Sequence, residues 1–353
     1  MRRPHRGARR WEIIMVRKLV GVGLAATLVL ALGMGAAAAQ TKVKFTLDWK
    51  FEGPATPYLV ALDKGFYKDE GLEVTVDPGN GSVDSVNRVA SGTYDIAFAD
   101  VSALIKFRDN KTNAAVKAVM MVYDAPPNSV ISLKKQGVAK PKDLEGKILG
   151  APATDASFSV WPIFVKANGI DASKVKVENI GFPVREPMLA QGKVDAVTGF
   201  WFSSYFNLKA NGATDDDIVV LLMSDYGVEV YGNAIMVNPA FAAANPKAVA
   251  GFVRATIKGL QETVKNPDAA IKSLMSRNAI VAEATELQRL KMALDRNIVT
   301  KAVLANGIGS IDNDRMARSI DQIALTFDFK DKPKVEDVFD AQYLPPKEQR
   351  GVK

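Results

Sequence analysis

Short apolar runs rich in β-branched residues alternate along the chain with segments in which apolar residues recur every three or four positions. This alternation predicts a layered α/β fold in which strands and helices follow one another. The predicted strands span residues 43–49, 73–79, 94–100, 115–124, 129–135, 147–153, 175–181, 195–200, 217–225 and 231–238. The helices predicted between them span residues 57–71, 82–92, 101–109, 141–146, 157–169, 185–192 and 201–212. After Pro239 the strands cease, and long amphipathic helices are expected as far as Phe327.

Two segments of the predicted fold repeat the same local pattern. Residues 91–100 and residues 191–200 each contain a glycine that ends a helix, then an aspartate three positions later, and then an apolar strand. Such joints are common in α/β proteins generally. Together with the strand and helix alternation on both sides, the repetition favours two lobes of similar construction.

The first 39 residues carry the three parts of a secretory signal peptide. A basic beginning is followed by an apolar run from Leu19 and by small residues at Ala37 and Ala39. Met15 starts a more compact version of the same signal and is an alternative start of translation. Because the apolar run approaches the length of a membrane span, a retained anchor is the other interpretation. No basic stop-transfer cluster follows the run, so we expect cleavage after Ala39.

The positive charge of the chain comes almost entirely from this leader. The 353 residues carry a formal charge of +7, with 46 basic and 39 acidic residues. Residues 1–39 hold seven of the basic residues and one of the acidic ones, so the remaining chain carries only +1. A nearly neutral chain offers no electrostatic basis for binding nucleic acid, and we expect no nucleic-acid partner.

The residue types that support much of enzyme chemistry are missing from the chain after the leader. There is no cysteine, and the one histidine is His5. Disulfides, thiolate metal sites, cysteine nucleophiles and a cysteine-linked lipid anchor are therefore excluded. Without histidine the chain also lacks the commonest general base and metal ligand. We expect no metal, no cofactor and no catalysis, with a secreted enzyme that uses the carboxylates Asp48 and Asp100 as the alternative.

Ligands of open α/β sheets bind beyond the carboxyl ends of the strands. The residues found at those ends are Asp48, Trp49, Glu52, Asn80, Phe98, Asp100, Thr154, Asp155, Ser157 and Trp201. Tyr58 adds an aromatic ring nearby, and Tyr123 and Tyr231 flank the two points at which the chain would pass between the lobes. The competing interpretation is structural, because such aspartates, serines and threonines also cap helices and such tryptophans also fill cores.

Aromatic faces combined with single carboxylates suit a small, flat or amine-bearing ligand. We expect Trp49 and Trp201, from opposite lobes, to stack on one ligand while Asp100 accepts a hydrogen bond from its edge. A sulfonate, nitrate or carboxylate anion is the alternative ligand. It would require helix N-termini and an arginine, for which Arg88 and Arg185 are the candidates.

Several motifs resemble the solute-binding proteins of ABC importers in the NMT1/THI5-like group. They are Asp48-Trp49 after the first strand, DKGFYKDEGL at 63–72, SGTYDIAFAD at 91–100, PKDLEGKILGAP at 141–152, GKVDAV at 192–197 and PAFAAANPKAVAGFV at 239–253. The resemblance implies a type II periplasmic-binding-protein fold, in which two α/β lobes are joined by a two-stranded hinge. Lobe I would comprise residues 41–124 and 232–353, and lobe II residues 125–231.

The resemblance also implies a function. The protein would be a periplasmic, monomeric binding component without a lipid anchor, and its partners would be a small-molecule ligand and the permease and ATPase subunits of an importer. The motifs do not specify the ligand; the aromatic rings and carboxylates at the strand ends favour a cyclic, nitrogen-bearing one, similar to a thiamin-precursor pyrimidine. By position, the resemblance would place these residues in the cleft: Asp48, Trp49, Asn80, Asp100, Thr154, Ser157 and Trp201. The pyrimidine synthases of the same group depend on a histidine and a cysteine-rich motif, from which this chain departs.

Overall fold

The computed structural model describes Met1 and residues 40–352. The predicted leader, including its cleavage position, therefore lies outside the described residues apart from Met1. The fold described below belongs to the compact unit that starts at Gln40. None of the helices in the described part of the chain combines the length and the apolar character needed to cross a membrane.

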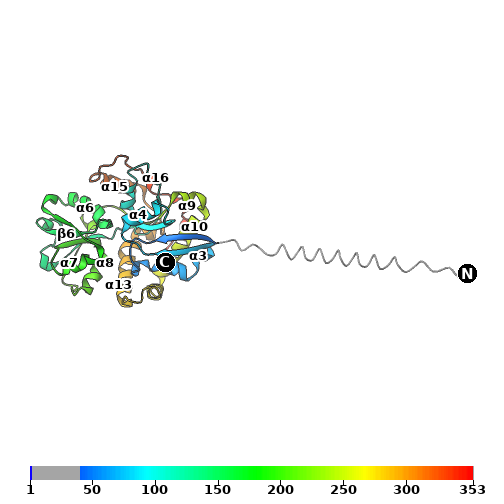
Figure 1. The fold of residues 1–353 in the computed structure, drawn as a ribbon, viewed down its shortest axis with the longest axis horizontal. Coiled ribbons are helices and arrows are strands. Elements are labelled where there is room, and N and C mark those ends of the chain that lie inside the picture. The colour runs from blue at the N-terminus through cyan, green and yellow to red at the C-terminus, as the bar shows by residue number, and fades with distance from the viewer. Residues whose placement is uncertain (2–39, 353) are drawn as a thin grey trace. The chain divides into compact units, whose positions relative to one another are not determined.

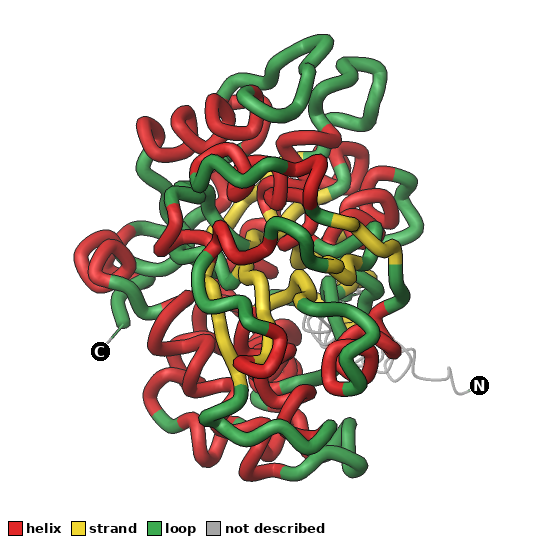
Figure 2. The backbone as a smooth tube through the Cα atoms, turned by 90° about the vertical axis from the view of Figure 1, so that its left-hand side faces the viewer, coloured by secondary structure: helices red, strands yellow, loops and turns green. Residues whose placement is uncertain are grey.

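Two five-stranded sheets form the centres of the two lobes (Figure 1, Figure 2). The first sheet has the order β2 (Leu72–Asp77), β1 (Thr41–Thr46), β3 (Ile96–Asp100), β10 (Asn233–Val237) and β4 (Lys117–Met121). The second has the order β7 (Lys176–Asn179), β6 (Ile148–Ala151), β8 (Ala196–Phe200), β5 (Asn128–Leu133) and β9 (Ile218–Leu222). In each sheet the first three strands are parallel, and the fourth is antiparallel to both neighbours. The mixed α/β fold is thus built from two sheets of the same topology.

The repeated sequence pattern has the same structural role in both sheets. Asp95, just before β3, exchanges two hydrogen bonds with the backbone of Lys44 in β1, at 2.8 and 3.0 Å. Asp195, just before β8, makes the equivalent pair with Ile148 in β6, both at 2.8 Å. The aspartate side chain thus extends the parallel pairing by one step in each lobe.

Helices pack against both sheets. In lobe I, α2 (Thr56–Asp63) packs against α10 (Pro246–Lys265), and α4 (Ser82–Ala90) contacts β3. In lobe II, the strands are contacted by α6 (Ala156–Ala167), α7 (Arg185–Ala190) and α8 (Trp201–Ala210). The remaining helices are α3 (Phe66–Asp69), α5 (Val101–Phe107), α9 (Pro239–Ala244), α11 (Pro267–Ala270), α12 (Lys272–Met275), α13 (Glu283–Ala293), α14 (Lys301–Asn306), α15 (Asn313–Ala324) and α16 (Val335–Val338). A π-helical turn, Leu294–Ile298, continues α13.

Three helix predictions differ from the structure. The segment predicted as a helix over 141–146 forms a 3-10 helix, Pro141–Leu144. The helix predicted over 57–71 is divided into α2 and α3, because Gly65 between them has φ of 76°, a left-handed conformation that ends the first helix. The predicted long helices after Pro239 include one of 20 residues, α10, while the others are shorter. Pro246 and Pro267 each lie at the first position of a helix, where their missing N–H is tolerated.

The chain passes between the sheets twice, and the two passages run side by side. The backbone N–H of Tyr123 donates to the carbonyl of Asn233 over 2.9 Å, and that of Gly232 donates to the carbonyl of Tyr123 over 3.0 Å. A Cβ atom at Gly232 would lie 2.7 Å from Cβ of Tyr123, so only glycine permits this approach. Every strand of the first sheet falls within the predicted lobe I and every strand of the second within lobe II, and we keep these two names.

Candidate functional site

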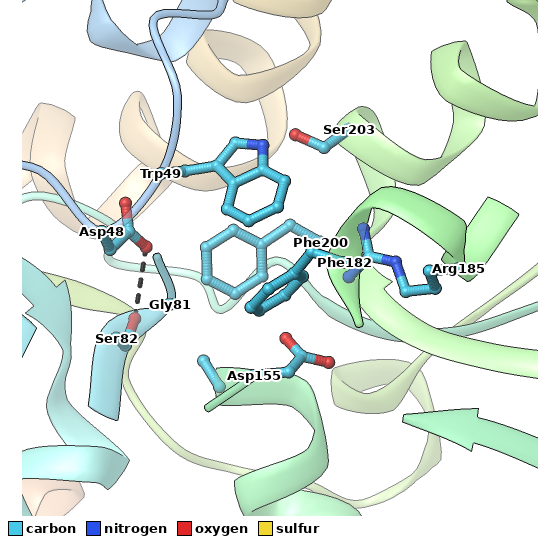
Figure 3. Close-up of a pocket in the computed structure, with 10 residues that line it drawn as sticks. Asp48, Trp49, Gly81, Ser82, Asp155, Phe182, Arg185, Phe200 and Ser203 are labelled. Carbon is cyan, nitrogen blue, oxygen red and sulfur yellow. Dashed lines mark hydrogen bonds between the residues drawn. The ribbon is translucent and has the colours of Figure 1, made fainter. Parts of the chain in front are cut away.

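Two adjoining cavities, called the interlobe cavities below, lie between the lobes at the carboxyl ends of strands (Figure 3). They contain about 320 and 340 Å³ of space free of protein atoms, which includes space open to solvent. The first is lined by Asp48, Trp49, Gly81, Ser82, Asp155, Ala156, Phe182, Arg185, Phe200 and Ser203. The second is lined by Leu47, Asp48, Trp49, Lys50, Glu52, Pro54, Ala55, Tyr58, Phe98, Tyr123, Phe200, Phe202 and Ser203. Both lobes therefore contribute side chains to each cavity.

Aromatic rings form much of the wall. In the first cavity Trp49 from lobe I meets Phe182 from lobe II, with ring centroids 4.5 Å apart and planes at 60°. A ligand ring inserted between them would need about 7 Å, twice the usual carbon–carbon contact. A flat ligand must therefore separate these two rings or lie against the neighbouring ring of Phe200. In the second cavity the ring of Phe98 contacts those of Tyr58 and Tyr123, each at 5.2 Å.

Asp48 is the carboxylate of lobe I at both cavities. Its Oδ2 accepts hydrogen bonds from Asn233 Nδ2 over 2.7 Å and from Ser82 Oγ over 3.2 Å. No described residue donates to its Oδ1. Burial raises the pKa of Asp48 to about 7 against the lowering effect of these hydrogen bonds, and the negative charge of Asp100 adds to the rise. Near neutral pH this carboxyl can accept an N–H from a ligand or share a proton with it.

Lobe II contributes a carboxylate and an arginine to the first cavity. Asp155 caps α6 by accepting from the backbone N–H of Ser157 over 3.2 Å, and its other oxygen accepts from Thr198 Oγ1 over 2.6 Å. Burial raises the pKa of Asp155, although the charge of Arg185 opposes the shift. Arg185 lies 2.7 Å from Oε1 of Glu186. Burial acts to lower the pKa of Arg185, but the charges of Glu186 and Asp155 outweigh it and the pKa is raised.

A buried cluster of charges beside the second cavity crosses from one lobe to the other. Glu52 of lobe I accepts from Trp49 Nε1 over 3.1 Å and from Ser203 Oγ of lobe II over 2.6 Å. Arg289 of α13 lies 3.1 Å from Glu52 and also 3.1 Å from Glu286. The same guanidinium donates to the backbone carbonyl of Ser203 over 3.1 Å. We call Glu52, Ser203, Glu286 and Arg289 the interlobe charge cluster.

The lobes are in contact on several sides of the cavities. Thr154 Oγ1 of lobe II donates to the carbonyl of Asn80 over 3.0 Å, and Trp201 Nε1 donates to Asn297 Oδ1 over 3.1 Å. With the bond from Ser203 to Glu52, these contacts describe a closed arrangement of the lobes.

The structure brings seven of the thirteen residues that the sequence singled out to the walls of the cavities: Asp48, Trp49, Glu52, Tyr58, Phe98, Tyr123 and Asp155. Asn80 and Thr154 instead contact each other across the lobes. Tyr231 lies at the hinge, where its hydroxyl accepts from the backbone N–H of Asp312 over 2.8 Å and its ring packs against Arg315 at 3.9 Å. The remaining three residues, Asp100, Ser157 and Trp201, do not line the cavities, contrary to the prediction.

Trp201 does not face the interlobe cavities. It lines a separate groove with Tyr205, Lys209 and Asp295. The reason is that α8 begins directly at Trp201 without a linker after β8. This abrupt change of backbone direction turns Phe200 toward the cavities and Trp201 away from them. The expected stacking of both tryptophans on one ligand is therefore not supported, and Phe200 takes the place of Trp201.

Asp100 and Ser157 lie beneath the site rather than in its wall. Asp100 is fully buried and caps α5 by accepting from the backbone N–H of Ser102 over 2.8 Å. Burial raises the pKa of Asp100 to about 6. Ser82 separates it from Asp48, since Ser82 Oγ donates to Asp48 and accepts from the Asp100 N–H over 3.1 Å. Ser157 is also fully buried, at the start of α6.

The side chains of the cavity wall that were not among the predicted site residues include Phe182, Phe200, Ser203 and, as part of the site, Arg185. Phe200 could have been found, since it is the last residue of a predicted strand. Phe182 and Arg185 follow β7 at its carboxyl end, the position that the general rule for α/β sheets indicates. Ser203 lies within the first turn of α8, where only the direction of the helix decides which side chains face the cavities.

Comparison with known proteins identifies the family. A model of the NMT1/THI5-like family matches residues 54–270, more than half of the chain, and the protein belongs to that family. The formylaminopyrimidine-binding protein of Halalkalibacterium halodurans is 28% identical over 260 residues, which cover 72% of this chain and 77% of the relative. The riboflavin-binding protein RibY of Chloroflexus aurantiacus is 32% identical over 216 residues, which cover 61% of this chain and 60% of the relative.

The relatives also include enzymes, and the fold of this chain is that of periplasmic binding proteins. The 4-amino-5-hydroxymethyl-2-methylpyrimidine phosphate synthase of Legionella pneumophila is 25% identical over 239 residues, 67% of this chain and 73% of the relative. Among solved structures, the periplasmic aliphatic sulphonate binding protein SsuA of Escherichia coli has a TM-score of 0.67 at 12% identity and covers 86% of this chain and 99% of that chain. Likeness at this identity shows the fold alone, and it confirms the two-lobed fold implied by the sequence motifs.

Proposed function

We propose that the protein is the solute-binding component of an ABC importer and captures a small, cyclic, nitrogen-bearing molecule in the interlobe cavities. The observation that carries this proposal is the pairing of aromatic rings with an available carboxylate oxygen. Trp49, Phe182 and Phe200 offer faces for a flat ring, and Asp48 Oδ1 offers an acceptor for an N–H on its edge. The name of the Halalkalibacterium halodurans relative points to a ligand of the same class.

The charges around the cavities disfavour the alternative ligand, a sulfonate, nitrate or carboxylate. Asp48, Asp155 and Glu52 line the cavities, whereas the lining cations among the described residues are Arg185 and the exposed Lys50. Glu186 already pairs with that arginine. Arg88, the other candidate, pairs with Asp84 on α4 and lines neither cavity. A fully charged anion would therefore be buried among carboxylates, which is electrostatically unfavourable.

We propose binding without turnover. The chain after the leader has no histidine and no cysteine, and the two carboxylates of the alternative enzyme do not face one ligand, because Asp100 is buried behind Ser82. The experiment is a calorimetric titration with 4-amino-5-hydroxymethyl-2-methylpyrimidine, riboflavin and methanesulfonate, followed by chromatography of each probe. We expect saturable binding of the pyrimidine, recovered unchanged. Binding of methanesulfonate alone, or conversion of a probe, would contradict the proposal.

Replacing Trp49 by Ala is expected to weaken binding of 4-amino-5-hydroxymethyl-2-methylpyrimidine by roughly five- to a hundredfold, the effect of losing one stacking partner. Trp49 is half-buried, so the fold should survive. The matched control is Trp201→Phe, which keeps an aromatic ring outside the interlobe cavities and removes the hydrogen bond to Asn297 together with part of the indole's packing. Calorimetry should show a smaller change for the control. Equal losses in both variants would refute the assignment of Trp49 to the ligand.

Ligand binding is expected to shift the molecule toward the closed arrangement. Both lobes line each cavity, so a bound molecule contacts both and favours their approach about the hinge. Small-angle scattering should show a smaller radius of gyration with saturating 4-amino-5-hydroxymethyl-2-methylpyrimidine than without it. Identical profiles at saturation would argue against hinge closure.

We also propose that the protein acts in the periplasm, with a membrane permease and an ATPase as its partners. The support is the predicted leader and the periplasmic-binding-protein fold. N-terminal sequencing of the exported protein should begin at Gln40 or within a few residues of it. Retention of the apolar run from Leu19 in a membrane fraction would overturn this proposal.

A further inference from the structure

Arg185 keeps one guanidinium nitrogen without an acceptor at the first interlobe cavity. Its Nε donates to Glu186 Oε1 over 2.8 Å, and its Nη2 donates to Ser204 Oγ over 3.0 Å. No described residue accepts from Nη1, although the side chain is 3% exposed. Figure 3 shows the guanidinium extending toward the rings of Phe182 and Phe200. Nη1 is not among the buried atoms that lack a partner, so it keeps some accessible surface at the cavity, where an acceptor on a ligand can take its N–H.

The neighbouring residues hold the guanidinium in this position. Gly199 of β8 leaves room for it, because a Cβ atom there would lie 3.0 Å from Arg185 Nη1. The ring of Phe182 lies 5.4 Å from Cζ of Arg185, and that of Trp49 lies 6.0 Å from it. With Glu186 and Ser204 fixing two of its nitrogens, the third is a preorganised donor rather than a mobile charge.

The charges near Arg185 select the kind of acceptor. Glu186 is 2% exposed and pairs with the guanidinium, and Asp155 lies near enough to raise its pKa. The positive charge is therefore already balanced by carboxylates. An anionic ligand group would meet Asp155 and Asp48 in the same cavity. A neutral acceptor, such as a carbonyl or hydroxyl oxygen, can use the free N–H without adding another negative charge.

We propose that Arg185 is a specificity-determining residue, whose Nη1 donates to a neutral carbonyl or hydroxyl on one side of the ligand while Asp48 Oδ1 accepts from an N–H on another side. This inference rests on the proposed function and narrows its ligand class. The ligand is a planar nitrogen heterocycle that carries both groups. Because Asp48 belongs to lobe I and Arg185 to lobe II, such a ligand links the lobes through its two polar sides.

The test compares two probes that share the aminopyrimidine ring. Formylaminopyrimidine carries a carbonyl acceptor, and 4-amino-2,5-dimethylpyrimidine has a methyl group in place of the substituent that carries it. Calorimetry on the unaltered protein should show tighter binding of the formyl probe. In Arg185→Met this preference should shrink by roughly ten- to a hundredfold, the range for a hydrogen bond to a charged group. Binding of the dimethyl probe should change far less.

Two further variants keep the test decisive. Arg185→Met leaves Glu186 buried without its partner, so the double variant Arg185→Met with Glu186→Gln serves if the single variant does not fold. Arg88→Met, which removes an arginine outside the cavities, should retain the full preference. An unchanged preference in a folded Arg185 variant would overturn the role of Arg185 and leave the proposed function standing. Failure of the unaltered protein to bind either probe would overturn both.

Discussion

Replacing Asp48 by Asn is expected to weaken binding of 4-amino-5-hydroxymethyl-2-methylpyrimidine by roughly a hundredfold. Asn233 Nδ2 and Ser82 Oγ both donate to Asp48 Oδ2, so an asparagine must place its oxygen toward them. Its NH₂ group then faces the cavity, where the carboxylate oxygen Oδ1 had been an acceptor. The ligand N–H loses a charge-assisted hydrogen bond and meets a donor instead. Calorimetry measures the loss, and unchanged affinity would exclude Asp48 from the site.

The same substitution is expected to stabilise the ligand-free protein at alkaline pH. The folded-state pKa of Asp48, about 7, lies above its ordinary value of 3.8, so the folded protein holds a proton that the unfolded chain releases. The free energy of unfolding therefore falls as the pH rises from about 4 to about 7. The asparagine side chain has no proton to lose, and at pH 8 the variant should be more stable by on the order of 4 kcal/mol.

Chemical denaturation at pH 4, 6 and 8 tests this dependence. The difference between Asp48→Asn and the unaltered protein should grow with pH, because only the unaltered protein must ionise a buried carboxyl at position 48. Asp314→Asn, at an exposed position of α15, should leave the profile unchanged. A variant less stable at pH 8 than the unaltered protein would contradict the expected cost of ionising Asp48 in the folded state.

Replacing Arg289 by Met is expected to destabilise the protein by about 3–5 kcal/mol, the effect of removing one partner from a buried ion pair. Arg289 is 4% exposed and is the arginine that contacts both Glu52 and Glu286. Without it, two carboxylates remain buried, and the pKa of Glu286 is already raised by burial. The loss also removes hydrogen bonds from lobe I to the backbone of Phe202 and Ser203 in lobe II.

The matched control is Arg254→Met. Arg254 pairs with Glu70 over 2.6 Å, but its side chain is 39% exposed, and exposed ion pairs contribute at most about 1 kcal/mol. Chemical denaturation should therefore separate the two variants clearly. An Arg289→Met protein as stable as the control would show that the interlobe charge cluster contributes nothing to holding the lobes together.

Much of the fold follows from patterns that are local in the sequence. The alternation of apolar runs predicted the strands of both sheets. The glycine–aspartate joints at 91–100 and 191–200 correctly indicated two lobes of similar construction. In each lobe the aspartate side chain accepts a hydrogen bond from the neighbouring strand. The division of the helix predicted over 57–71 depends on a left-handed glycine, whose sign of φ the sequence does not determine. The sequence patterns therefore predicted the presence of helices and strands more accurately than the residues at which they end.

The site was predicted as a region but not side chain by side chain. The rule that ligands bind at carboxyl ends of strands led to Asp48, Trp49 and Asp155. The rule could not decide whether Phe200 or Trp201 faces the cavities, because neighbouring side chains at a strand-to-helix junction point in different directions. It also could not show that Ser82 lies between Asp48 and Asp100, since that depends on how β1, β3 and α4 meet.

Native mass spectrometry of the protein purified from cells that export it, with no ligand added, tests the central claim most directly. Released solute is identified by tandem mass spectrometry after denaturation in organic solvent. We expect one bound molecule per chain, a small nitrogen heterocycle released unchanged. Recovery of a sulfonate, nitrate or carboxylate anion instead would contradict the account.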